Sequence, residues 1–172
     1  PTAPHFTESV GGTVYRHWLS ELSPDQDLSL YFHIPYCDTL CWFCGCYTKV
    51  VRRYEPVARY LEMLLDEIDL VADTLDRRFR ARHLHWGGGS PTLLNATDWQ
   101  RLIERIYARF DVGPDAEIAV EMDPRDTSED YIDALAWTGV NRASIGVQDF
   151  HPEVQKAINR IQPFDVTERV VG

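Results

Sequence analysis

Two kinds of hydrophobic spacing alternate along this chain of 172 residues. In four short segments the apolar residues recur at about every second position, as in a β-strand; these are residues 28–34, 83–89, 116–122 and 142–148. Between and after them the apolar residues recur three and four positions apart, as in an amphipathic helix; these segments are residues 54–75, 97–110, 127–139 and a stretch from about residue 152. Four strand–helix units in succession predict a parallel sheet, either doubly wound or a barrel.

Polar residues mark the ends of two of these predicted helices. Thr97 with Gln100, and Thr127 with Asp130, have the spacing of a capping box, in which the threonine side chain caps the helix. Gly139 stands where a helix commonly ends, because glycine readily adopts the left-handed backbone conformation. The pattern therefore predicts one helix beginning near Thr97 and another running from Thr127 to Gly139.

Each predicted strand has one apolar face and one small or polar face. In residues 28–34, Leu30, Phe32 and Ile34 alternate with Tyr31 and His33. A sealed eight-stranded barrel fills its interior with branched aliphatic side chains. The polar faces therefore favour a wider, open barrel with polar contents, while strands that simply expose one face to solvent are the alternative.

The chain is acidic, with 27 Asp and Glu against 17 Lys and Arg and a formal net charge of −10. This charge argues against binding to nucleic acid, and the arginine-rich run at residues 77–82 is interpreted as a solvated helix end. The sequence has no apolar run long enough to cross a bilayer and no N-terminal signal peptide. We expect a cytoplasmic monomer that contacts neither nucleic acid nor membrane.

The expected organisation is an N-terminal segment, residues 1–27, leading into a core of residues 28–172. The first residue is not Met, and four strands cannot close a barrel. We therefore expect the core to be incomplete, with its C-terminal part missing.

All the cysteines lie within ten positions, with the spacing Cys37-x3-Cys41-x2-Cys44-x-Cys46. Disulfides are disfavoured, because cytoplasmic thiols stay reduced and such short loops gain little stability from cross-linking. Zinc sites usually use two separated ligand pairs, and no second cysteine pair exists, although a histidine could complete a zinc site. Iron–sulfur clusters accept crowded cysteines. A non-catalytic zinc or other metal-binding module stays open as an alternative.

The first three cysteines carry a more specific resemblance. Cys37-x3-Cys41-x2-Cys44 resembles the signature of the radical S-adenosylmethionine (SAM) superfamily. The resemblance implies that three cysteines hold a [4Fe–4S] cluster and that the fourth iron binds SAM. The segments "YFHIPYC", "FCGC", "HWGGGSPT", "EMDPR" and "GVQDF…NR" are similar, in order and spacing, to one subfamily, the oxygen-independent coproporphyrinogen III oxidases of haem biosynthesis.

That subfamily implies a reaction and a fold. The reaction is oxidative decarboxylation of two propionates of coproporphyrinogen III to vinyl groups, giving protoporphyrinogen IX, through a SAM-derived 5′-deoxyadenosyl radical and with an electron donor protein. The fold is α/β, a partial (β/α) barrel with parallel strands and outer helices, about four of the family's six β–α units being present. This chain alone is therefore expected to be inactive. Haem chaperones of the same superfamily are the alternative, but they typically lack a cysteine at the position of Cys46.

The resemblance also implies roles for individual residues. Cys37, Cys41 and Cys44 match the cluster ligands, and Cys46 matches a cysteine needed for activity that is not a ligand. Residues that match the binding site of the first SAM are Tyr31, which is also assigned to catalysis, Gly87, Gly88, Gly89 and Glu121. Residues that match the site of a second SAM are Phe43, Gly89, Ser90, where the family usually has threonine, Gln148 and Arg160. His33 and Arg125 match family residues without an assigned role.

Overall fold

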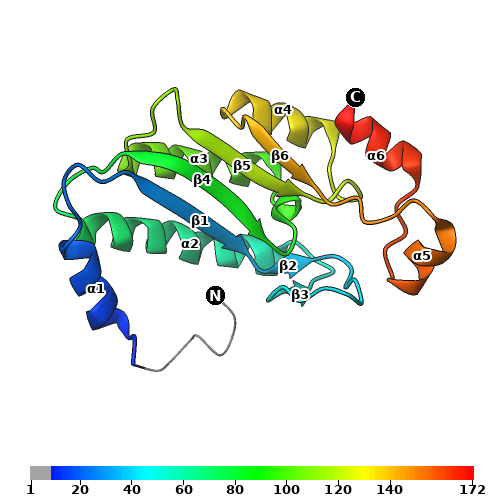
Figure 1. Cartoon of the computed structure of the whole chain (residues 1–172), viewed down its shortest axis with the longest axis horizontal. Helices are drawn as coiled ribbons and strands as arrows, with labels where there is room; N and C mark the ends of the chain where they lie inside the picture. Colours follow the sequence, from blue (N-terminus) through cyan, green and yellow to red (C-terminus); the bar gives the residue numbers. More distant parts are fainter. Residues whose placement is uncertain (1–8) are drawn as a thin grey trace.

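The computed structural model describes residues 9–172, and its centre is a parallel four-stranded sheet (Figure 1). The strands are β1 (Leu28–Ile34), β4 (Ala81–Gly88), β5 (Glu117–Met122) and β6 (Arg142–Ile145), which lie in that order across the sheet. Two shorter strands, β2 (Tyr36–Cys37) and β3 (Lys49–Val50), form a separate parallel pair directly after β1. The α/β fold with parallel strands is confirmed.

The helices connect the strands in the expected order. They are α1 (Gly12–Ser20), α2 (Glu55–Thr74), α3 (Ala96–Arg109), α4 (Glu129–Trp137), α5 (Pro152–Ala157) and α6 (Phe164–Val171), with a 3-10 turn at Pro91–Leu93. Because the strand order follows the chain order and such crossovers are right-handed, the crossover helices cover one face of the sheet. Along this layer α2 packs against α3, and α3 packs against α4. The opposite face carries no helix layer in the described part of the chain (Figure 1).

The hydrophobic core fills the space between the sheet and this helix layer. Phe32, Ile34 and Trp86 are fully or almost fully buried. The Phe32 and Trp86 rings stack at 4.9 Å, and Trp86 lies 4.9 Å from the ring of Trp99 on α3. Burying each of these large side chains contributes about 2–3 kcal/mol. The opposite face holds Tyr31, which is 58% exposed, so the predicted alternation of apolar and polar faces is confirmed for β1. In β6 the predicted apolar residue Ala143 is exposed, because this edge strand is less covered.

The predicted helix caps are displaced by one or two residues, which corrects the sequence interpretation. The side chain of Asn95, not Thr97, caps α3 by accepting a hydrogen bond of 2.8 Å from the Asp98 amide. Ser128, not Thr127, caps α4 by accepting one from the Tyr131 amide. Several neighbouring polar residues could each serve as a cap, so the capping-box spacing chose the wrong one.

The other end of α4 agrees with expectation. Gly139 has φ +89° directly after the C-cap Thr138, the position at which a helix commonly ends with glycine.

The N-terminal segment contains a helix that its hydrophobic pattern did not predict. Helix α1 buries none of its residues, and Trp18 on it is 51% exposed. Part of the predicted segment 1–27, residues 1–8, lies outside the described residues. The boundary at residue 27 coincides with the start of β1, and the division into two parts stays a prediction.

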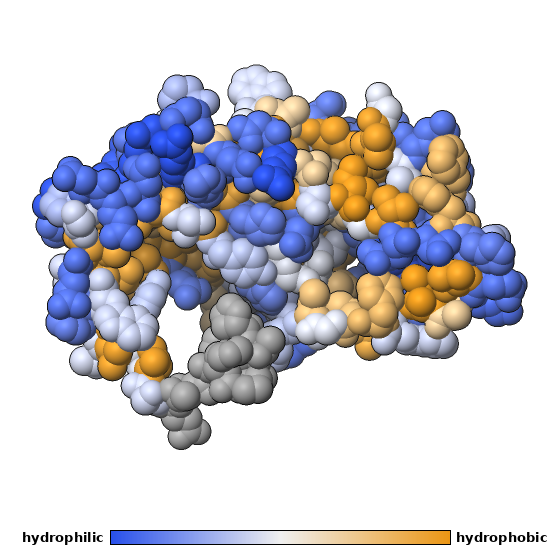
Figure 2. All heavy atoms as spheres, viewed as in Figure 1, coloured by the Kyte–Doolittle hydropathy of each residue, from blue (hydrophilic) through white to orange (hydrophobic). Residues whose placement is uncertain are grey.

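The exposed hydrophobic residues are unevenly distributed over the surface. Figure 2 shows hydrophobic residues exposed on the side of the molecule where β6, α5 and α6 lie. Ile161, between α5 and α6, and Phe164, the first residue of α6, are both exposed. Strand β6 is an edge strand, with no further partner in the described part of the chain. None of the described helices is both long and apolar enough to cross a membrane.

Candidate functional site

A cavity of about 380 Å³ opens at the carboxyl ends of the parallel strands. In such sheets this edge commonly holds the functional site. The predicted site residues that line it are Cys37, Cys41, Phe43, Cys44, Cys46, Gly88, Gly89, Glu121, Gln148 and Arg160. The structure therefore gathers all of the residues assigned to the site from the sequence except Tyr31, Gly87 and Ser90. Their individual roles stay predictions.

The loop that carries the cysteines is held from one side by the segment after α5. The Trp42 amide donates to the Ile158 carbonyl at 3.0 Å, and the Asn159 side chain donates to the Leu40 carbonyl at 2.8 Å. Asn159 has φ +55°, a left-handed backbone conformation, and its side-chain amide reaches the cysteine loop. The loop is thus positioned by a segment more than a hundred residues away in the sequence.

The four cysteines are free thiols. Cys41 is buried, Cys37 and Cys44 are partly buried, and Cys46 is exposed. No two of them are joined by a disulfide, the alternative that the sequence already disfavoured. Burial raises the pKa of the Cys37 thiol, although the hydrogen bond from Thr48 lowers it. Burial thus favours the neutral thiol, whereas a bound metal favours the thiolate, because cysteine binds metals in its deprotonated form.

The cysteines raise the question of which kind of metal centre they could hold. No group of three or more His, Cys, Asp or Glu side chains in the described part of the chain lies close enough together to hold one metal ion. In a [4Fe–4S] cluster each thiolate binds a different iron, so its ligands stand farther apart than those of one ion. Cys37, Cys41 and Cys44 line one cavity, and their role as cluster ligands stays a prediction.

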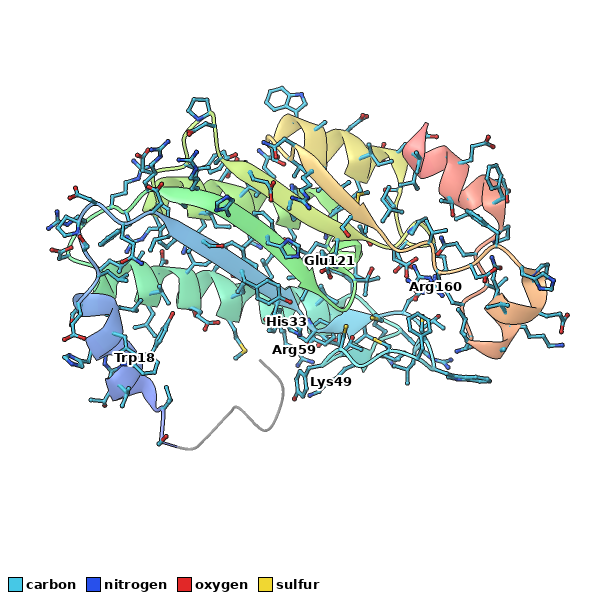
Figure 3. All side chains as sticks on the ribbon, viewed as in Figure 1. Trp18, His33, Lys49, Arg59, Glu121 and Arg160 are labelled. Atoms are coloured by element: carbon cyan, nitrogen blue, oxygen red, sulfur yellow. The ribbon has the colours of Figure 1, made fainter. Side chains whose placement is uncertain are left out.

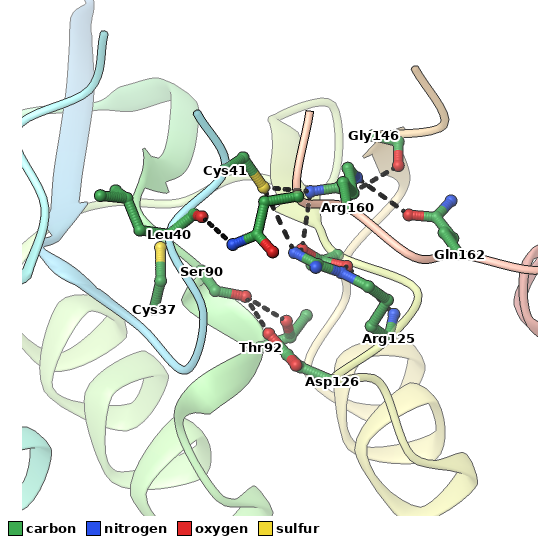
Figure 4. Close-up of polar contacts among 12 residues, drawn as sticks. Cys37, Leu40, Cys41, Ser90, Thr92, Arg125, Asp126, Gly146, Arg160 and Gln162 are labelled. Carbon is green, nitrogen blue, oxygen red and sulfur yellow. Dashed lines mark hydrogen bonds and ion pairs between the residues drawn. The ribbon is translucent and has the colours of Figure 1, made fainter. Parts of the chain in front are cut away.

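Two guanidinium groups approach the sulfur of Cys41 (Figure 4). Arg125 Nη2 and Arg160 Nη1 each lie 3.6 Å from Cys41 Sγ. Between the two arginines, Asp123 accepts from Arg125 Nη2 at 2.6 Å and from Arg160 Nη1 at 2.9 Å. Both arginines therefore place a donor group beside this sulfur. Arg160 is held further by its bonds to the Gly146 carbonyl and to Gln162.

Asp123 is the centre of this network. Burial raises its pKa, but the hydrogen bonds from Arg125 and the charge of Arg160 outweigh burial and the net pKa is lowered. The side chain is only 12% exposed, so it is an ionised carboxylate inside the protein whose charge is balanced by two arginines. Sequence reasoning missed Asp123. The sequence does contain an indication of it, because Asp123 directly follows the third predicted strand. The carboxyl ends of parallel strands are where functional sites commonly form.

The glycines at the end of β4 allow the Glu121 side chain to lie against the backbone of this strand. Gly88 donates its amide to Glu121 Oε2 at 3.3 Å, and His85 Nε2 lies 3.2 Å from Glu121 Oε1. A Cβ on Gly87 would come within 2.8 Å of the same carboxylate. Gly88 has φ +112°, and a Cβ there would meet the His33 ring at 2.6 Å. The glycine run is therefore needed for close packing and for its backbone conformation, and its predicted contact with SAM stays a prediction.

Tyr31 lies on the same sheet face but does not line the cavity. Its hydroxyl hydrogen-bonds with His33 Nδ1 at 3.0 Å, and its ring stacks on His85 at 5.8 Å. The other nitrogen of His33 contacts the Tyr47 carbonyl at 2.8 Å, in the residue after Cys46. Tyr31 is therefore linked to the cavity through histidines, and Figure 3 shows His33 and Glu121 on this face of the strands.

Ser90 also lies outside the cavity lining. It is buried, its hydroxyl bonds with Thr92 Oγ1 at 2.8 Å, and it donates to Asp126 Oδ2 at 3.0 Å (Figure 4). Burial, with the nearby charge of Asp123, raises the pKa of Asp126 to about 7. The Ser90 hydroxyl thus has protein partners, and its contact with a second SAM stays a prediction.

Comparisons with known proteins agree with this geometry. A sequence profile of the radical SAM superfamily matches residues 31–172. The chain is 48% identical over 171 residues to an oxygen-independent coproporphyrinogen III oxidase of Bradyrhizobium diazoefficiens, covering 99% of this chain and 38% of that protein. It is 43% identical over 165 residues to the protein of the same name from Escherichia coli, covering 94% of this chain and 35% of that protein.

A solved structure is also similar over nearly the whole chain. The coproporphyrinogen III oxidase of Escherichia coli, described as a radical SAM enzyme, superimposes with a TM-score of 0.90 at 40% identity, covering 99% of this chain and 39% of that one. The chain thus spans well under half the length of these relatives. The matched profile covers most of the chain, including all four cysteines. The chain belongs to the radical SAM superfamily.

Proposed function

We propose that this chain forms the cluster-binding and SAM-binding part of an oxygen-independent coproporphyrinogen III oxidase. The observation that carries the proposal is the single cavity that brings Cys37, Cys41 and Cys44 together with Cys46, Gly88 and Glu121. The sequence identity of 48% to a curated oxidase supports this choice within the superfamily. The reaction is the oxidative decarboxylation of two propionates of coproporphyrinogen III to vinyl groups.

Cys37, Cys41 and Cys44 hold the [4Fe–4S] cluster in this proposal. Membership of the superfamily implies this cluster and SAM as cofactors. Together they supply one-electron chemistry strong enough to remove a hydrogen atom from a substrate propionate. The chain's own contribution is to hold three thiolates around the cavity and to leave one iron open for SAM. Arg125 and Arg160 place their guanidinium groups 3.6 Å from the sulfur of Cys41.

The carboxyl ends of β4 and β5 bind SAM. Gly88 and Gly89 line the cavity, where their backbone can contact the methionine part of SAM, and the Glu121 carboxylate can accept hydrogen bonds from ribose hydroxyls. Tyr31 bounds the same face of the sheet. A second SAM would contact Phe43, Gly89, Ser90, Gln148 and Arg160.

Cys46 distinguishes the oxidase from its nearest alternative. Its thiol lines the cavity beside the three ligands and is exposed. Haem chaperones of the superfamily bind haem without decarboxylation and, by resemblance, typically lack this cysteine. We therefore assign Cys46 to the reaction and not to the cluster. The substrate carboxylates require basic partners, and Arg125 and Arg160 are the candidates on the cavity wall.

The test is an anaerobic assay with reconstituted protein, dithionite, SAM and coproporphyrinogen III, in which the chain is extended to the length of its curated relatives because the chain alone is expected to be inactive. The oxidase proposal predicts 5′-deoxyadenosine together with CO₂ and vinyl product. Haem binding without CO₂ release would instead identify a chaperone. Zinc in place of iron in the purified protein would identify a non-catalytic metal module.

A further inference from the structure

An exposed basic segment lies next to the cysteine loop. Lys49, Arg52 and Arg53 are exposed, and none of them forms an ion pair with another described residue. Most arginines elsewhere in the described part of the chain pair with Asp or Glu, for example Arg80 with Asp115. Three unpaired cations within five positions are unusual for a chain of net charge −10.

This segment is joined directly to a predicted cluster ligand. Strand β3 pairs with β2 so that Val50 stands opposite Cys37. The Val51 amide donates to the Cys37 carbonyl at 2.9 Å, and Thr48 Oγ1 lies 3.2 Å from Cys37 Sγ. The surface strand is therefore one hydrogen bond away from the residue whose sulfur would bind iron.

The surface beside the basic segment is hollowed and partly apolar. A hollow of about 240 Å³ is lined by Arg52, Arg53, Tyr54 and the apolar Val57, with Asp38 as its acidic residue. Val50 is 46% exposed next to it. The nearby Arg59 is already paired with Glu55 at 3.7 Å, so it adds no free charge. Figure 3 shows Lys49 beside β3 at the outer margin of the molecule.

We propose that Lys49, Arg52 and Arg53, here called the β3 basic surface, dock an acidic one-electron carrier protein that reduces the cluster. This inference rests on the proposed function, because a cluster that drives radical chemistry must receive an electron from outside. One electron passes from the reduced carrier to the oxidised cluster. The carrier is oxidised by one electron, and no bond is formed or broken.

The chemistry of this surface selects a protein carrier. Electron-transfer complexes are small and weak, and opposite charges raise their association rates. The short path through the Val51–Cys37 hydrogen bond places the docked donor close to the cluster, whereas the cavity side is left to SAM and substrate.

The test measures how fast an acidic flavodoxin, reduced to its hydroquinone, reduces the oxidised cluster in anaerobic stopped-flow experiments. The double variant Arg52→Gln/Arg53→Gln removes two charges from the β3 basic surface. The matched control Arg16→Gln/Arg169→Gln removes two exposed cations from α1 and α6 that likewise form no ion pair among the described residues. We expect the first variant to lower the association rate about tenfold at low salt and to weaken its salt dependence, with the control unchanged.

Reduction by dithionite, a small inorganic reductant, distinguishes a failure of the docking proposal from a failure of the proposed function. Dithionite should reduce the cluster at the same rate in all three proteins, which also shows that the variants fold and assemble. Equal flavodoxin rates in all three, with a cluster that dithionite reduces, would overturn the docking surface alone. A parent protein with no reducible cluster would overturn the proposed function and the docking surface with it. A single Lys49→Gln variant should slow the flavodoxin reaction less than the double variant does, and an unchanged rate there would count against the surface.

Discussion

Replacing Asp123 by asparagine tests the charge network behind the cysteine loop. Asp123 is 12% exposed and bonds to Arg125, whose side chain is 16% exposed, and to Arg160, whose side chain is 8% exposed. Removing one partner of a buried ion pair costs about 3–5 kcal/mol, because a charge is left buried without compensation. The asparagine side chain would keep one acceptor oxygen, so we expect the lower end of that range. For a chain of this length a loss of about 3 kcal/mol lowers the melting temperature by about 6–12 °C.

The assay is urea and thermal unfolding of the metal-free protein. The matched control is Asp115→Asn, which removes a carboxylate also placed beside two arginines, Arg80 and Arg82. Those side chains are exposed, so solvent and salt screen the interaction and its loss should change stability little. If Asp123→Asn and Asp115→Asn shift the urea midpoint equally, the argument that burial makes the Asp123 network strong is refuted.

The same variant predicts a pH dependence. Burial raises the pKa of Asp123, yet its arginine partners lower the net pKa below the ordinary value of 3.8. Because the folded pKa is lower than the unfolded pKa, the stabilisation is fully present above the unfolded pKa and is lost as the pH falls through the folded pKa. The difference in free energy of unfolding between the parent and Asp123→Asn should therefore shrink below about pH 4.

Three further predictions concern the site and its supports. Arg125→Gln removes a positive charge 3.6 Å from Cys41 Sγ, so the midpoint potential of the reconstituted cluster should fall, as measured by EPR at poised potentials. Cys46→Ser should keep the iron content and the EPR signal of the parent while losing product formation in the protein extended to the length of its relatives, and a loss of iron would instead make Cys46 a ligand. Ser128→Ala should cost about 1 kcal/mol in urea unfolding, because the Tyr131 amide loses its cap; an unchanged midpoint would contradict that assignment.

The sheet and its crossover helices could be predicted from the sequence because their patterns depend on local periodicity. The alternation of Phe32 with Tyr31 and His33 gives the buried and exposed faces of β1, and the structure repeats it in burial. Helix α1 escaped prediction because it buries none of its residues, so no core selects its apolar spacing. The cap at Asn95 escaped because several polar residues nearby compete for that position.

The candidate site was predictable to the extent that it lies in one stretch of sequence. Cysteine spacing and the glycine run identify residues on two loops, and a shared cavity brings them together. The Asp123 network and the bond between Ser90 and Asp126 depend on side-chain directions at the ends of different strands. Neighbouring strands are aligned by long-range pairing, so no local pattern reveals which polar groups meet there.

The most direct test of the central claim is EPR spectroscopy of the anaerobically reconstituted, dithionite-reduced protein, recorded with and without SAM. The claim is that Cys37, Cys41 and Cys44 hold a [4Fe–4S] cluster with one iron open to SAM. It predicts a reduced-cluster signal that changes when SAM is added and that is lost in Cys41→Ser. A signal that SAM leaves unchanged, or stoichiometric zinc without iron, would contradict it.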